Sequence, residues 1–187
     1  SSFSELWAFL WINMALFLPG VLLRFRDRPG DLLNRLLAYP SLLLAGALFG
    51  GIGCLLVRGR WRFSLPRGGS LLSLLLNSFG VLFVIVGRWY PKAPEDSKTC
   101  RRALGMQAVV EWVGLLLLFC AGAFVYWENA IFYQVATMAA SLLVYRVIPF
   151  MPFASFGGGR VWAWSKAAFA LLALLTIGLV FILPRWF

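Results

Sequence analysis

Three charged side chains within apolar stretches are the first candidates for chemistry in this sequence. Glu111, Arg146 and Lys166 each lie inside or at the edge of a long apolar segment, where an ionisable group is costly and is usually paired or functional. A pair between Glu111 and Arg146 would neutralise both charges, and Lys166 can extend its ammonium group to the headgroups. A proton or ion pathway would need more than one acid at this depth. We therefore predict an intramembrane ion pair between Glu111 and Arg146.

The sequence contains no histidine, which removes the usual ligand of haem and catalytic zinc and the commonest general base. Its three cysteines show no CxxC spacing, and Cys54 and Cys120 lie in apolar segments, where a thiol behaves as a small apolar side chain. We expect no catalytic residues, no metal site and no cofactor bound through histidine. The residue types do not exclude structural lipids as ligands.

The elements that hold these residues are apolar segments long enough to cross a bilayer. Apolar residues make up 61% of the chain and charged residues 13%, and the mean hydropathy is +0.84. A soluble domain carries roughly 25% charged residues. We expect a single all-α domain over residues 1–187, a polytopic transmembrane helical bundle of about six spans with short interfacial segments such as 31–39. The expected spans are 7–23, 41–57, 70–87, 106–127, 131–148 and 161–183.

Basic residues between the spans indicate orientation and partners. The net charge is +10, and an arrangement with both ends outside places most Lys and Arg residues on the inside, with the 88–105 loop in the cytoplasm. Basic residues in such loops contact anionic headgroups, so membrane lipids are favoured as partners and nucleic acid is not. We expect a multi-pass integral protein of the bacterial inner (cytoplasmic) membrane.

The loop at 58–63 alternates arginines with glycine and aromatic residues. A period of two is typical of a short strand with a cationic face and an aromatic face. Such a strand could pair with a partner's strand, but contact with lipid is favoured. We expect the lipid-facing basic and aromatic residues to be Arg58, Arg60, Trp61, Arg62 and, after a glycine turn, Arg160.

Three glycines in the second expected span have the spacing of a helix-packing face. Gly46, Gly50 and Gly53 are separated by four and three residues, so they lie on one side of a helix. Small residues at this spacing let another helix approach closely. The pattern predicts close packing and indicates no chemistry.

Two stretches resemble the site-2-protease-type intramembrane zinc metalloproteases. They are LLLAGALFGGIGCLLV with the following RWRFSLPRGG, and SLLVYRVIPFMPFASFGGGRVWAWSK, within residues 41–69 and 139–183. The resemblance implies zinc ligands at Gly50, Cys54 and Gly157 and a catalytic glutamate at Gly51. None of these positions holds the required residue, and a lone thiol does not hold zinc. The resemblance therefore implies a degenerate relative without metal ligands.

Together these observations predict a non-catalytic protein that acts as an accessory, scaffolding or assembly subunit of a larger membrane complex, a pseudoprotease scaffold with other membrane subunits as partners. The alternative is a small transporter or channel-like protein that uses Glu111 and Arg146. Its path would be lined by polar residues of three segments, Asn77, Gln107, Glu111, Gln134 and Arg146. A third interpretation, an active protease, is opposed by the missing ligands.

Overall fold

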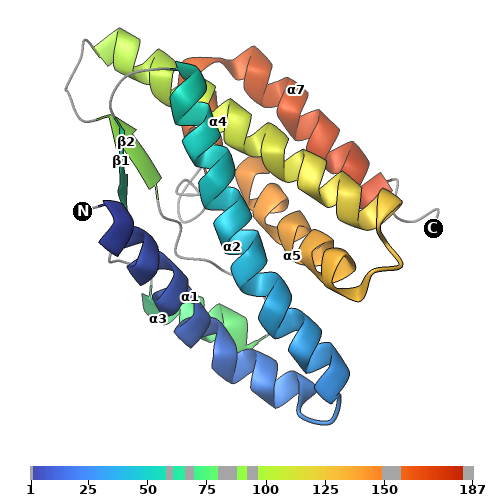
Figure 1. Cartoon of the computed structure of the whole chain (residues 1–187). Helices are drawn as coiled ribbons and strands as arrows, with labels where there is room; N and C mark the ends of the chain where they lie inside the picture. The colour runs from blue at the N-terminus through green and yellow to red at the C-terminus, as the bar shows by residue number, and fades with distance from the viewer. Residues whose placement is uncertain are drawn as a thin grey trace.

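A computed structural model of the chain describes residues 2–57, 61–65, 70–79, 88–91, 97–148 and 157–182. Helices dominate these residues, as the sequence predicts, and two short strands accompany them (Figure 1). In chain order the elements are α1 Ser2–Phe25, α2 Pro29–Val57, β1 Trp61–Ser64, α3 Ser70–Ser78, β2 Arg88–Pro91, α4 Ser97–Cys120, the π-helix η1 Ala121–Val125, α5 Ala130–Val147, α6 Gly158–Trp164, α7 Lys166–Ile177 and the π-helix η3 Gly178–Ile182.

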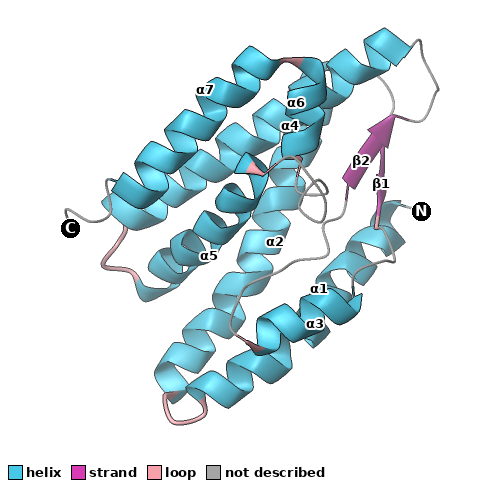
Figure 2. Ribbon diagram, turned by 180° about the vertical axis from the view of Figure 1, so that it is seen from behind, coloured by secondary structure: helices cyan, strands magenta, loops and turns pink. Residues whose placement is uncertain are grey.

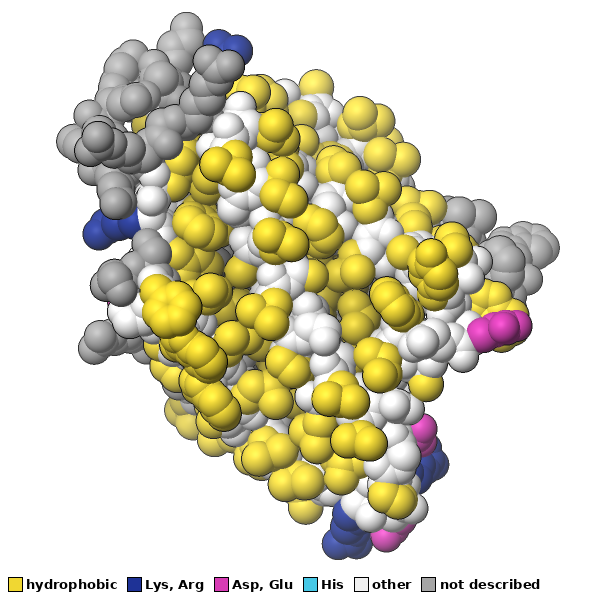
Figure 3. Space-filling view, in the orientation of Figure 1, with side chains coloured by type: hydrophobic (Ala, Val, Ile, Leu, Met, Phe, Trp, Pro, Cys, Tyr) yellow, Lys and Arg dark blue, Asp and Glu magenta, His cyan; other side chains and the backbone are white. Residues whose placement is uncertain are grey.

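Four helical segments are long and apolar enough to cross a membrane. They are Phe3–Phe25, Pro29–Val57, Cys100–Val125 and Ala130–Val147, with mean hydropathies of 2.0, 2.0, 2.2 and 1.4. A shorter apolar helix covers Lys166–Phe181. These lengths and compositions are those of a multi-pass membrane protein. Hydrophobic side chains spread over the middle of the face in Figure 3, and the described charged side chains lie at its edges.

The stretch 31–39 does not lie apart from the second span but forms the first part of α2. The helix continues through Pro40, although proline removes one main-chain hydrogen bond from the ladder. Ser41 donates a hydrogen bond from its hydroxyl to the carbonyl of Leu37, 2.8 Å away, within the same turn. Tyr39, fully buried, stacks on Phe17 of α1 with ring centroids 4.0 Å apart.

Helix α2 lies between two groups of helices. On one side it contacts α1, which lies beside α3 in both views; on the other it packs on α4 and α5 (Figures 1 and 2). Trp112 of α4 is fully buried and donates its indole N–H to Thr176 of α7 at 2.9 Å, which satisfies a polar group in the core. The buried core runs through α1, α2, α4, α5 and α7 as one cluster.

The two strands do not support the prediction that 70–87 crosses the membrane once, and the structure describes this expected span only as far as residue 79. β1 pairs with β2 in antiparallel orientation, and Ser64 lies opposite Arg88. Ser64 and Arg88, which flank this stretch of the chain, therefore lie at the same end of the bundle. Hydropathy could not reveal this, because an apolar segment that returns and one that crosses have the same composition.

The first turn of α1 lies at the same end of the bundle as the strands. The main-chain N–H of Leu65, just after β1, donates to a carboxylate oxygen of Glu5 at 3.2 Å. Residues near Glu5, the 61–65 segment and β2 are therefore neighbours, and the turn between α1 and α2 lies at the far end of these helices (Figure 1).

The sixth expected span is interrupted at Ser165. This residue is extended (φ −151°, ψ 113°), and its hydroxyl accepts a hydrogen bond from the main-chain N–H of Ala168 at 3.2 Å. A serine in this conformation caps the N-terminus of the following helix. The segment therefore consists of α6 and α7, which meet at a bend (Figure 2).

Candidate functional site

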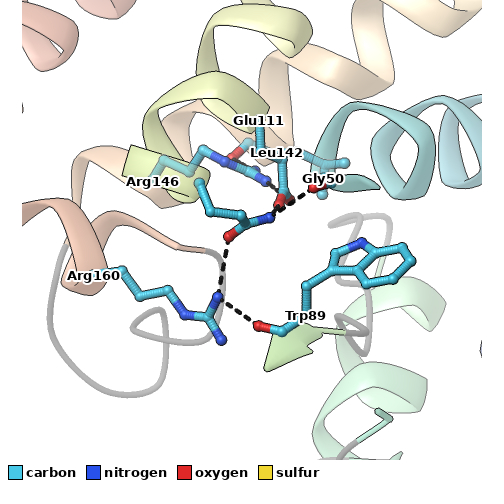
Figure 4. A network of polar contacts seen from close by, with 7 residues as sticks. Gly50, Trp89, Glu111, Leu142, Arg146 and Arg160 are labelled. Atoms are coloured by element: carbon cyan, nitrogen blue, oxygen red, sulfur yellow. Dashed lines mark hydrogen bonds and ion pairs between the residues drawn. The ribbon is translucent and has the colours of Figure 1, made fainter. Parts of the chain in front are cut away.

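The polar centre of the structure is a buried ion pair between α4 and α5. Arg146 Nη2 lies 2.8 Å from Glu111 Oε1, and the two side chains are 4% and 19% exposed. Arg146 also donates through Nη1 to the carbonyl oxygen of Leu142, one turn earlier on α5, at 3.1 Å. The guanidinium therefore has both a carboxylate and a carbonyl as acceptors, as a buried cation requires. Figure 4 shows the two charged side chains pointing toward each other.

Gln107 joins this pair to α2. Its amide nitrogen Nε2 donates to Glu111 Oε2 and to the carbonyl oxygen of Gly50, each at 3.2 Å. Gln107 and Glu111 are four residues apart, a spacing that brings two side chains together on one face of a helix. Gln107 is 1% exposed, so its amide belongs to the interior of the bundle.

Arg160, which is expected to face lipid, extends the network to α6 and β2. Its Nη1 donates to Gln107 Oε1 at 3.1 Å and to the carbonyl oxygen of Trp89 at 3.0 Å, and its guanidinium carbon lies 5.3 Å from the ring centre of Tyr90. The side chain turns inward because these acceptors lie there (Figure 4).

Two of the three glycines of the expected packing face make close approaches. A Cβ at Gly53 would lie 2.9 Å from the carbonyl oxygen of Gln107, and one at Gly50 would lie 2.7 Å from the Trp89 ring. Gly46 departs from the prediction, since a Cβ there would meet nothing within 4 Å. At Gly53 the main chain of α4 lies against α2, and at Gly114 of α4 the ring of Phe49 lies against the main chain.

The remaining lipid-facing candidates have mixed outcomes. Arg58 and Arg60 fall outside the described residues. Trp61 and Arg62 lie on β1, and the period of two in the sequence predicts a strand at this place. Arg62 is exposed, whereas Trp61 is half-buried. Lys166 is exposed, with its ammonium nitrogen 5.2 Å from the centre of the Trp162 ring.

The polar residues of the alternative transport path are only partly brought together. Gln107, Glu111 and Arg146 converge, but Asn77 lies on α3, where its main chain packs against Gly20 of α1. Gln134 lies twelve residues before Arg146 on α5, about 18 Å along the axis. The five residues therefore do not form one line of polar groups.

The positions that the protease resemblance assigns to ligands lie around the ion pair. A Cβ at Gly50 would lie 3.1 Å from Glu111 Oε2, and one at Gly157 would lie 4.0 Å from Arg146 Nε. Gly157 has a φ of 105°, a conformation that favours glycine. Cys54 is buried one turn after Gly50. Within the described ranges no three His, Cys, Asp or Glu side chains lie close enough together to hold a metal ion.

Two members of this network, Trp89 and Gln107, are not among the site residues that the sequence predicts. The carbonyl of Trp89 accepts from Arg160, and its ring covers Gly50. Gln107 was considered only as part of a transport path. The four-residue spacing of Gln107 and Glu111 is a signal that could have found the amide, whereas no local pattern reports a contact across helices.

Comparison with known proteins supplies no relative. No protein-family model matches the chain, and no curated protein or solved structure matches it.

Proposed function

We propose that the protein is a non-catalytic subunit that scaffolds or assembles a larger membrane complex. The observation that carries this proposal is the state of Glu111: Oε1 is bound by Arg146 and Oε2 by Gln107. Such a carboxylate is already engaged as an acceptor and is poorly placed to act as a general base or a proton carrier. Its bonds instead fix the relative positions of the helices.

The extent of the network supports the same proposal. Its hydrogen bonds join α2 through Gly50, β2 through Trp89, α4 through Glu111, α5 through Arg146 and α6 through Arg160. A network in which the charged and amide side chains have partners helps to specify one arrangement of its elements, although the indole N–H of Trp89 beside it is buried without a partner among the described residues. A subunit that presents fixed surfaces to neighbours needs this property.

The pseudoprotease part of the proposal rests on where the network lies. In the resemblance, Gly50 and Gly157 stand at positions of metal ligands, and both flank the pair of Glu111 and Arg146. An ion pair that occupies the place of a metal can hold the same helices together without chemistry. This supports kinship with a scaffold that has exchanged its metal for a salt bridge.

For the membrane we propose five crossings, by α1, α2, α4, α5 and the α6–α7 segment, with 65–87 returning to the side it leaves. This replaces the six crossings expected from hydropathy. The strands, the residues near Glu5 and the loop before α4 then share one side, which carries most of the Lys and Arg residues and is therefore cytoplasmic. A bacterial inner membrane remains the proposed location.

The test of the scaffold proposal is the recovery of partners in a mild detergent. Tagged protein and a Gly50→Leu variant are purified from native membranes, and the accompanying membrane proteins are quantified by mass spectrometry. We expect the unaltered chain to retain other subunits in constant ratio and the variant to lose them. Because Gly46 faces open space, Gly46→Leu is the matched control and should retain them. Recovery of the unaltered chain alone would contradict the proposal.

The alternative, a small transporter or channel, is supported by the convergence of Gln107, Glu111 and Arg146 at membrane depth. Purified protein in sealed vesicles separates the two functions. The scaffold proposal predicts no solute or ion flux above that of empty vesicles. Flux that is lost in a folded Glu111→Ala variant would favour the transporter.

A further inference from the structure

An apolar pocket that the polar network does not use lies at the other end of the bundle. It has a volume of about 780 Å³ and lies between the end of α4, η1, the first half of α5 and η3. Its lining includes Phe124, Trp127, Tyr133, Thr137, Ala140 and Val180.

The chemistry of the lining selects an apolar occupant. None of the described residues that line the pocket is charged, and most of them are aromatic or aliphatic. The hydroxyl of Thr137 already donates to the carbonyl oxygen of Gln134 at 2.9 Å, so it does not need a ligand. Such a lining offers a water molecule few hydrogen-bond partners. A polar solute would lose its hydration there without gaining partners.

The pocket's mouth carries the side chains that mark a membrane interface. Trp127 and Tyr133 are 57% and 48% exposed and lie near the turn between η1 and α5. Tryptophan and tyrosine concentrate at the headgroup level because each has an apolar ring and a polar atom. From Tyr133 to Ala140 the lining follows α5 for about 10 Å, which is within one leaflet of a hydrocarbon core about 30 Å thick.

On either side of α5, the lining of the pocket includes a residue from a π-helical turn. Phe124 belongs to η1 and Val180 to η3, two segments that are far apart in the chain. Single π-helical turns occur frequently at functional sites. Two of them beside one pocket are an observation independent of its apolar lining.

We propose that this pocket binds an acyl chain of a bilayer lipid, with the lipid headgroup beside Trp127 and the chain running along α5 toward Ala140. Hydrocarbon is the medium around these helices, and an acyl chain has no polar group that would remain without a partner inside the pocket. The site is separate from the network of Glu111 and does not depend on the proposed function.

Photo-crosslinking identifies the occupant directly. The photoreactive residue p-benzoylphenylalanine replaces Thr137, an exposed lining residue, or Ala170, an exposed residue of α7 that serves as the control. Each protein is purified in detergent, which removes bulk lipid, and is then irradiated. The masses of the protein and its adducts are measured by mass spectrometry. We expect a lipid adduct at position 137 and none at 170. A protein adduct at 137, adducts of detergent alone, or equal lipid adducts at both positions would overturn the proposal.

A second variant tests occupancy without a crosslinker. Ala140→Phe places a ring in the pocket, and Ala170→Phe adds the same ring on an exposed surface. If the ring displaces two methylene groups of the chain, the retained lipid measured by native mass spectrometry should fall about tenfold. Ala170→Phe should leave it unchanged. Folded Ala140→Phe protein with undiminished lipid would contradict the assignment of the pocket, and the crosslinking result decides the case if this variant does not fold.

Discussion

Replacing Glu111 by glutamine removes the charge that Arg146 binds and leaves the shape of the side chain nearly unchanged. The Arg146 side chain is 4% exposed, so its guanidinium cannot recover water in place of the lost carboxylate. The bond to Leu142 remains, but a carbonyl is a weaker acceptor for a cation than a carboxylate is. The variant therefore holds a buried charge without its counter-charge.

The expected magnitude follows from this geometry. Removing one member of a buried ion pair costs on the order of 3–5 kcal/mol, whereas replacing both members by neutral groups is often close to neutral. We expect Glu111→Gln to lower the free energy of unfolding by about 3 kcal/mol, the lower figure, because Glu111 is 19% exposed. Combining it with Arg146→Met removes the uncompensated cation and should recover about 2 kcal/mol of that loss.

The assay is reversible unfolding in mixed micelles, with thermal stability in detergent as a second measure. Glu128→Gln is the matched control, since Glu128 is an exposed acid in the turn before α5 and its neutralisation should change stability by less than about 0.5 kcal/mol. A double variant that is no more stable than Glu111→Gln alone would refute the reasoning, because the buried charge would then not be the source of the loss.

Three further predictions follow from the close contacts, the strand pairing and the missing ligands. Gly50→Leu should lower the melting temperature strongly, because a Cβ at Gly50 would lie 2.7 Å from the Trp89 ring. Gly46→Leu should not, because a Cβ at Gly46 would meet nothing within 4 Å. Equal melting temperatures of the two variants would contradict the packing. In sealed cells, an impermeant thiol reagent added outside should label neither Cys100 nor a cysteine placed at Phe3 (Phe3→Cys), because the residues near β1 and β2 share one side of the membrane. Labelling of only one of the two positions from outside would contradict the five-crossing arrangement. Metal analysis of purified protein should find no stoichiometric zinc, and zinc that is lost on Cys54→Ser would contradict the pseudoprotease proposal.

The features predicted well from sequence are those with a local signal. Long apolar runs predict the four long spans, and the period of two in the 58–63 loop predicts the strand at Trp61 and Phe63. These patterns depend only on residues that are close in the chain.

The features predicted poorly depend on packing between distant segments. Whether 65–87 crosses or returns is decided by pairing between Ser64 and Arg88. Arg160 turns inward because the carbonyl of Trp89 and the amide of Gln107 lie there. Gly46 shares a helix face with Gly50, but α4 approaches only part of that face. No spacing within one segment carries this information.

The central claim, that the chain is a structural subunit of a larger membrane complex, is tested most directly by native mass spectrometry of the assembly released from its own membranes. The chain contributes 20.9 kDa. The account predicts a particle of larger mass that contains this chain and other membrane proteins in fixed ratio and has neither proteolytic nor transport activity of its own. A particle that contains only copies of this protein, with solute flux that depends on Glu111, would contradict the account.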